Sequence, residues 1–195
     1  MNDAASGAAP HDQPRSRQTP VRCVALDFGG VLDKRADSGA APGAGHVHRV
    51  DGSLPVAPAA VEAIWGLHRL GLKVLVASNT RPGQSREAQL VAAGVRELLL
   101  AVLHSDRLDA AKPSPAFFAA VIAASGCAPA EICYVGNRLH TDVQPAVAAG
   151  LQAVLVASST PPSNRGGEVP DGVAVITHVR QLPGLLAQAI RKDAQ

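Results

Sequence analysis

The sequence predicts an α/β fold, namely a doubly wound, Rossmann-like parallel sheet with helices on both faces. From residue 22 onward, short apolar segments with strand character alternate with segments of helical periodicity. The strand-like segments are apolar almost throughout, as in strands that are buried on both faces of a parallel sheet. A chain of 195 residues with 47% hydrophobic residues can bury one core. We therefore expect a single α/β domain over residues 21–195.

The elements follow one another in a regular order. The first strand is "RCVALD", and the helix "VAPAAVEAIWGLHRLG" after it places Val61, Ile64, Trp65 and His68 on one face, with Trp65 expected in the core and His68 at the helix surface. The segment "GQSREAQLVAAG" predicts a helix that ends at Gly94. The remaining predicted elements are the strands "LKVLVASN", a part of "RELLLAVLHS", "EICYVG", "LQAVLVAS" and "GVAVITH", and the helices "SPAFFAAVIAASG", "TDVQPAVAAG" and "VRQLPGLLAQAIRK".

Three segments lie outside this alternation. Residues 1–20 lack periodicity and are expected to form a disordered tail. Residues 33–55 are rich in glycine and predict a short insertion, or flap, with a possible hairpin "HVHRVDGSL" turning at Asp51 and Gly52. Residues 159–172 predict a surface loop. None of these segments is long enough to form a second domain.

Composition excludes several classes of function. The formal net charge is +2 and aromatic residues make up 3% of the chain, which argues against binding to nucleic acid or to an anionic membrane. The three cysteines have no CxxC spacing, and Cys23 and Cys133 are expected to be buried. No segment has the length of a signal peptide's apolar region or of a membrane span, so a cytoplasmic protein is expected.

Reactive side chains gather at the predicted carboxyl ends of the strands. Asp27 follows the first strand, Ser78 and Asn79 end the second, and Asn137 follows "EICYVG". Ligands of open parallel sheets bind beyond these ends. Lys112, before Pro113, is expected near the start of the next helix. Asp142 opens the helix "TDVQPAVAAG" and should reach the same crevice.

These residue types suit phosphoryl transfer. An Asp carboxylate can attack phosphorus and form an aspartyl-phosphate. A hydroxyl at Ser78, backbone N–H groups and the ammonium of Lys112 could stabilise the charge on the phosphoryl oxygens. Asp27 and Asp142 could together hold Mg²⁺, which usually takes one or two protein carboxylates, while Gly29 and Gly30 let the backbone bend close to the ion.

The segments "DFGGVL", "VLVASN", "KPSP" and "YVGNRLHTDVQPAVAAG" together resemble the four ordered motifs of the haloacid dehalogenase-like hydrolase superfamily, whose members are mostly phosphatases. The resemblance runs from about residue 22 to about residue 178. It implies Asp27 as the nucleophile, Ser78 and Asn79 as phosphate-binding residues and Lys112 as the neutralising cation. It also implies that Asp27, the backbone carbonyl of Gly29, Asn137 and Asp142 occupy the metal positions.

The sequence departs from this pattern at two positions. Gly29 stands where phosphatases of the family usually have a second Asp that protonates the leaving group and later activates water. General acid catalysis typically contributes about 10²–10⁴-fold in rate, so its loss should slow the reaction. His46, His48 and Asp33 are the candidate substitutes. Asn137 stands where a metal-binding Asp is usual, so Mg²⁺ should bind more weakly.

Three functions follow from these residues. The first is a Mg²⁺-dependent phosphatase that acts on a phosphomonoester of unknown identity. The second is a catalytically impaired phosphate-binding or regulatory protein, because Gly29 and Asn137 remove two carboxylates. The third is a metal-independent dehalogenase, although residues 33–55 are too short for the large helical cap that such enzymes carry. A short flap leaves the crevice open, either to a bulky substrate or to a second subunit of a homo-oligomer.

Overall fold

The computed structural model describes residues 19–33, 54–157 and 167–193. The predicted disordered tail lies outside the described residues except for its last two positions. The predicted hairpin with His46 and His48 lies outside them except for Leu54, and so does most of the predicted loop 159–172. At the base of the insertion, Asp33 and Val56 form an isolated antiparallel bridge, so the two flanks of this segment lie side by side.

Six parallel strands form one sheet in the order β3-β2-β1-β4-β5-β6, which confirms the doubly wound fold. Beyond β1 the chain adds strands on one side as far as β3 and then crosses back to place β4 on the other side of β1. The strand order therefore reverses between β1 and β4, the position at which open α/β sheets bind ligands. The strands are β1 (Cys23–Leu26), β2 (Lys73–Ser78), β3 (Ala101–His104), β4 (Ile132–Gly136), β5 (Gln152–Val156) and β6 (Ala174–Ile176).

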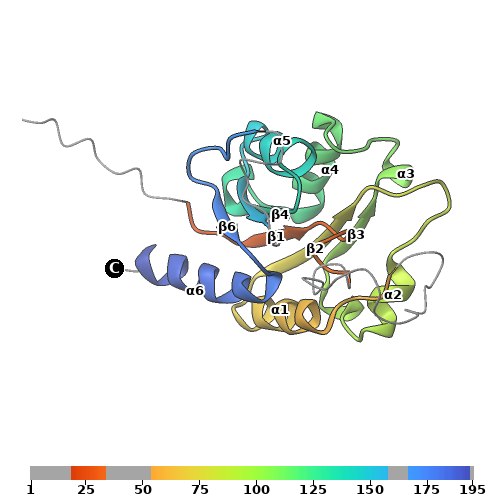
Figure 1. Cartoon of the computed structure of the whole chain (residues 1–195), viewed down its shortest axis with the longest axis horizontal. Coiled ribbons are helices and arrows are strands. Elements are labelled where there is room, and N and C mark those ends of the chain that lie inside the picture. The colour runs from red at the N-terminus through yellow and green to blue at the C-terminus, as the bar shows by residue number, and fades with distance from the viewer. Residues whose placement is uncertain (1–18, 34–53, 158–166, 194–195) are drawn as a thin grey trace, which may run out of the picture.

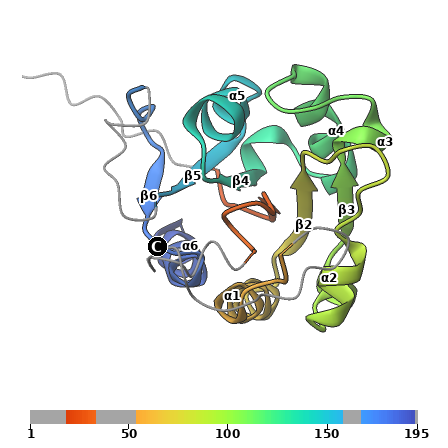
Figure 2. The ribbon, with the colours of Figure 1, turned by 45° about the vertical axis from the view of Figure 1, so that its right-hand side comes forward.

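Helices cover both faces of the sheet (Figures 1 and 2). Alternate residues of each strand point to opposite faces, so Val24 and Leu26 of β1 pack into one core layer and Cys23 and Ala25 into the other. The first layer includes α1 (Pro58–Arg69), α2 (Glu87–Ala92) and α6 (Leu182–Asp193). The second layer includes α3 (Ser105–Leu108), α4 (Pro115–Ser125) and α5 (Gln144–Ala148).

Local sequence explains where α4 begins and ends, whereas three other predicted elements differ at their start. The hydroxyl of Ser114 accepts a hydrogen bond from the backbone N–H of Ala116 and caps α4, and Gly126 ends this helix at φ +61°. The helix predicted over 83–94 is shorter, because it begins only at Glu87. The helix predicted over 141–150 begins as the π-helical turn η3 (Leu139–Val143) and continues as α5. The segment predicted to contain β3 begins as the 3₁₀ turn η1 (Arg96–Leu98).

The predicted buried face of α1 is wrong by one residue. Ala60, Ala63, Ile64 and Leu67 are buried and keep the predicted helical spacing one residue earlier, and Ala59 is buried beside them. Trp65, expected in the core, is 42% exposed, and its ring meets that of His68 edge to face. Small alanines let the helix approach the sheet closely, and the bulky indole is left at the surface. The burial expected for Cys23 and Cys133 is confirmed, and Phe117 and Phe118 of α4 are also buried.

Within the described residues, no helix is both long and apolar enough to span a membrane.

Candidate active site

The residues predicted to serve as nucleophile, phosphate-binding groups and metal ligands come together at the carboxyl ends of β1, β2 and β4. They line one cavity of about 330 Å³. Asp33 is not among its lining residues, and His46 and His48 lie outside the described residues. The lining residues are Asp27, Gly29, Gly30, Ser78, Asn79, Arg86, Lys112, Asn137, Arg138, Thr141 and Asp142.

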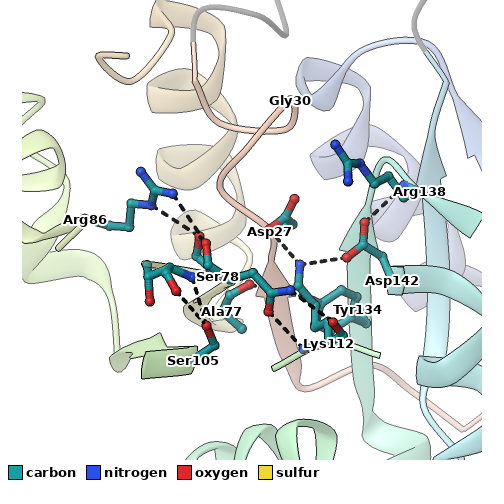
Figure 3. A network of polar contacts seen from close by, with 12 residues as sticks. Asp27, Gly30, Ala77, Ser78, Arg86, Ser105, Lys112, Tyr134, Arg138 and Asp142 are labelled. Atoms are coloured by element: carbon teal, nitrogen blue, oxygen red, sulfur yellow. Dashed lines mark hydrogen bonds and ion pairs between the residues drawn. The ribbon is translucent and has the colours of Figure 1, made fainter. Parts of the chain in front are cut away.

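Lys112 joins the two carboxylates of the cavity. Its Nζ donates a 2.7 Å hydrogen bond to Oδ1 of Asp27 and another of 2.7 Å to Oδ1 of Asp142 (Figure 3). Lys112 and Asp27 are each 7% exposed, and Asp142 is 1% exposed. These contacts link β1, the loop before α4 and the turn η3, which are far apart in the sequence. One buried cation thus lies between two buried anions.

The surroundings of this triad shift two pKa values. Burial raises the pKa of the Asp27 carboxyl, the negative charge of Asp142 raises it further, and Lys112 opposes both effects. Burial alone would lower the pKa of the Lys112 ammonium. The charges of Asp27 and Asp142 and the hydrogen bond to Asp142 outweigh burial, so the pKa of Lys112 lies above its ordinary value. The ammonium therefore stays charged throughout the neutral range.

Asn79 holds the backbone of Lys112. Its Oδ1 accepts a 2.9 Å hydrogen bond from the backbone N–H of Lys112, and its Nδ2 donates a 3.0 Å hydrogen bond to the carbonyl of the same residue. The Lys112 Nζ also lies 5.6 Å from the ring centre of Tyr134, within the range of a cation–π contact. In this structure, the amide of Asn79 positions the lysine, a function that the strand-end pattern did not reveal.

Arg86 is a lining residue that the sequence did not single out. Its Nε donates a 3.2 Å hydrogen bond to the hydroxyl of Ser78, which itself donates at 3.2 Å to the carbonyl of Asn79. The guanidinium carbon lies 4.7 Å from the ring centre of Phe28. Arg86 falls inside the predicted helix 83–94, where a lone arginine resembles any solvated residue. The sequence offered one signal for Arg86, namely that a basic residue follows soon after the strand end with Ser78 and Asn79.

Arg138 and Gly136 fix the other carboxylate. The backbone N–H of Arg138 donates a 3.0 Å hydrogen bond to Oδ2 of Asp142. A Cβ atom added at Gly136 would lie 2.3 Å from Cβ of Asp142, a distance that real side chains do not tolerate. The absence of a side chain at Gly136 therefore allows Asp142 to pack against the end of β4.

Asn137 packs against the turn that follows β1. Gly30 has φ +78°, and a Cβ atom at this position would lie 2.2 Å from Nδ2 of Asn137, so only glycine fits. Oδ1 of Asn137 is buried and has no hydrogen-bond partner among the described residues. Asp33, only 1% exposed, accepts a 3.1 Å hydrogen bond from the backbone N–H of Gly30 and so supports the same turn.

The donor set fits a hard cation that prefers oxygen ligands. Two carboxylates and the partnerless amide oxygen of Asn137 line one cavity, and Mg²⁺ completes such partial sets with water. In the part of the chain that the structure describes, no three His, Cys, Asp or Glu side chains cluster as a metal site. Any ion here would therefore depend on two carboxylates and neutral oxygens.

Comparisons with known proteins agree with this arrangement. A family model described as haloacid dehalogenase-like hydrolase matches residues 36–150, which include Ser78, Lys112 and Asp142, while Asp27 lies just before the match. The chain is 35% identical over 102 residues to the phosphoserine phosphatase of Thermus thermophilus, an alignment that covers 52% of this chain and 41% of that protein.

It is also 30% identical over 100 residues to the glyceraldehyde 3-phosphate phosphatase of Methanothermobacter thermautotrophicus, covering 50% of this chain and 44% of that one. The chain thus matches less than half the length of either curated relative. The solved structure of the L-2-haloacid dehalogenase of Xanthobacter autotrophicus has the same fold, with a TM-score of 0.65 at 20% identity over 86% of this chain and 98% of that chain. With its family model matched over more than half its length, this chain belongs to the haloacid dehalogenase-like hydrolases.

Proposed function

We propose that this protein is a Mg²⁺-dependent phosphatase that hydrolyses phosphomonoesters through an aspartyl-phosphate on Asp27. The observation that carries this proposal is the buried bridge of Lys112 between Asp27 and Asp142, at the point where the strand order reverses. The two curated relatives act, by their names, on different phosphate esters. They support phosphate-ester hydrolysis as the reaction class and leave the alcohol of the substrate open.

In the first step, an oxygen of the Asp27 carboxylate attacks phosphorus. A bond forms between this oxygen and phosphorus, and the bond to the ester oxygen breaks, so the leaving group departs with the electron pair. The Lys112 ammonium, held at 2.7 Å from Oδ1 of Asp27, orients the nucleophile and offsets negative charge as the phosphoryl group arrives. The hydroxyl of Ser78 turns its proton from the carbonyl of Asn79 toward a phosphoryl oxygen.

In the second step, water attacks the phosphorus of the aspartyl-phosphate. The acyl phosphate bond breaks, inorganic phosphate leaves, and the Asp27 carboxylate is regenerated. Among the described lining residues, only Asp27 and Asp142 carry carboxyl groups, and both are bound to Lys112. At the position of Gly29, solvent rather than a side chain therefore supplies and accepts the protons. This predicts slow turnover of esters whose leaving group is strongly basic.

A bound Mg²⁺ would reduce the repulsion between an anionic nucleophile and an anionic substrate. Asp27, Asp142, the amide oxygen of Asn137 and the backbone carbonyl of Gly29 would hold it. Direct titration of Mg²⁺ by calorimetry tests this assignment without turnover. Asn137→Asp should tighten binding about tenfold, because the donor set gains a negative charge, and Asp142→Asn should weaken it. Equal affinity in all three proteins contradicts the assignment.

The test of the proposed function is phosphate release from p-nitrophenyl phosphate, with Mg²⁺ and with EDTA. This ester has a good leaving group and needs little help from an acid. The wild type should turn over only with Mg²⁺, and Asp27→Asn should lose activity at least about 10³-fold. Asp171→Asn, an equal change at an exposed position, is the matched control and should retain full activity.

A second candidate function is a phosphate-binding protein with impaired chemistry. The lack of an acid or base at Gly29, together with the neutral Asn137, favours it. Binding of phosphate without any turnover of p-nitrophenyl phosphate would select this candidate. Halide release from 2-haloacids in EDTA would instead select the dehalogenase reaction.

A further inference from the structure

Arg86 is held beside the cavity by its backbone and by its head group, whose Nη2 donates at 3.5 Å to the carbonyl of Asn79 and to Oε1 of Gln84. Its backbone N–H donates a 2.9 Å hydrogen bond to Nε2 of His104, a residue 1% exposed at the carboxyl end of β3. Its guanidinium lies over the face of Phe28, directly after Asp27, and its Nε contacts the hydroxyl of Ser78. A surface arginine normally keeps many rotamers, whereas these contacts restrict both the backbone and the planar head group.

His104 is suited to this anchoring because it is neutral. Burial lowers the pKa of its imidazole, and the positive charge of Arg107 lowers it further. A neutral imidazole can accept the hydrogen bond from Arg86 at Nε2. The backbone position of Arg86 is thus fixed by the core of the sheet rather than by contacts on the surface.

The charge of the cavity favours an anion near Arg86. Three cations, Arg86, Lys112 and Arg138, line the cavity together with two carboxylates, Asp27 and Asp142. Lys112 contacts both carboxylates, whereas the guanidinium of Arg86 contacts the hydroxyl of Ser78. Figure 3 shows Arg86 and Arg138 on opposite sides of Asp27 in this view.

We propose that Arg86 binds the phosphoryl group directly, together with Ser78, on the side of the nucleophile opposite Asp142. This inference rests on the proposed function and adds a specificity-determining residue to it. The guanidinium supplies paired N–H donors that match two oxygens of a phosphate. The site should therefore prefer dianionic phosphomonoesters, which present three terminal oxygens, over phosphodiesters, which present two and carry a single charge.

The alternative is that Arg86 only stiffens the loop between β2 and α2. Three variants separate the two roles. Arg86→Gln removes the charge, Arg86→Lys retains the charge but not the paired donors or the planar contact with Phe28, and Arg81→Gln removes a charge from an exposed position in the same loop. Circular dichroism and thermal melting identify any variant that fails to fold. If Arg86→Gln does not fold, Arg86→Lys still tests the proposal.

The experiment is a calorimetric titration of inorganic phosphate into each protein, once with Mg²⁺ and once with EDTA. Loss of a charge-assisted pair of hydrogen bonds should weaken phosphate binding by Arg86→Gln about 10- to 100-fold. Arg86→Lys should fall between Arg86→Gln and the wild type, and Arg81→Gln should match the wild type. The preference of wild-type turnover for p-nitrophenyl phosphate over bis(p-nitrophenyl) phosphate should shrink by a similar factor in Arg86→Gln.

The outcomes separate this inference from the proposed function. Weaker phosphate binding in Arg86→Gln supports the inference even if the wild type shows no turnover, in which case only the enzymatic proposal fails. Unchanged phosphate affinity in folded Arg86→Gln and Arg86→Lys overturns the inference and leaves the phosphatase proposal standing. A wild-type protein that binds no phosphate in either condition overturns it as well.

Discussion

The Nζ of Lys112 lies 2.7 Å from Oδ1 of Asp27, and both residues are almost completely buried. The same cation also contacts Asp142, so one buried ammonium faces two buried carboxyl groups. Buried charge of this kind costs stability unless every partner is present. Substitutions that remove one of these charges should therefore change the stability of the protein.

Replacing Lys112 by methionine should strongly destabilise the fold at neutral pH. The change leaves Asp27 and Asp142 buried without their cation, and breaking a buried ion pair from one side costs about 3–5 kcal/mol. Burial raises the pKa of the Asp27 carboxyl, so this loss of stability should diminish as the pH falls and Asp27 becomes protonated. Urea unfolding from pH 4 to pH 8 measures this loss in the free energy of unfolding. Lys192→Met, at an exposed position, is the control. An equal free energy of unfolding in both variants contradicts the role of Lys112.

Asp27→Asn should abolish activity and yet stabilise the protein at neutral pH. Burial raises the pKa of Asp27 in the folded state, so its favourable contribution to stability is complete below about pH 4, the unfolded value, and is lost as the pH rises through the folded value. Asparagine does not ionise, so the variant does not lose this stability as the pH rises. The free energy of unfolding of Asp27→Asn relative to wild type should therefore increase from pH 4 to pH 8. The acidic limb of kcat/KM in the wild type should also lie above pH 4.

Gly30→Ala should lower both stability and Mg²⁺ affinity, whereas Gly83→Ala should lower stability alone. The two glycines have similar backbone angles, φ +78° and φ +75°, and alanine in this region costs about 1–2 kcal/mol. Only at Gly30 would the new methyl group also meet Nδ2 of Asn137, at 2.2 Å, whereas nothing lies within 4 Å at Gly83. Equal effects of the two substitutions on Mg²⁺ titration would show that Asn137 is not held by this turn.

Gly29→Asp should accelerate hydrolysis of alkyl phosphates more than that of p-nitrophenyl phosphate. A carboxyl group at this position could protonate a basic leaving group, an effect of about 10²–10⁴-fold where the acid is needed. An aryl leaving group gains little from it. The ratio of kcat/KM for the two ester types, in Gly29→Asp against the wild type, is the measurement. A uniform change for both esters would indicate an effect on binding rather than on proton transfer.

The sequence by itself determined the order of the strands along the chain, their burial and the residues at their ends. Apolar segments such as "VALD" read directly as strands because their side chains are buried on both faces. A parallel sheet brings its carboxyl ends to one edge, so Asp27, Ser78 and Asn137 could be expected to meet. The positions of Lys112 and Asp142 at the starts of helices pointed to the same crevice, and the family resemblance added their roles there.

Tertiary structure alone decided the contacts between these residues. The orientation of α1 depends on how closely alanines approach the sheet, so Trp65 could not be placed by helical periodicity. The hydrogen bonds of Asn79 to Lys112 and of Arg86 to His104 join segments that are distant in sequence. Local sequence patterns indicate which side chains are buried. A hydrogen bond between distant segments depends instead on where both backbones lie after the core has packed.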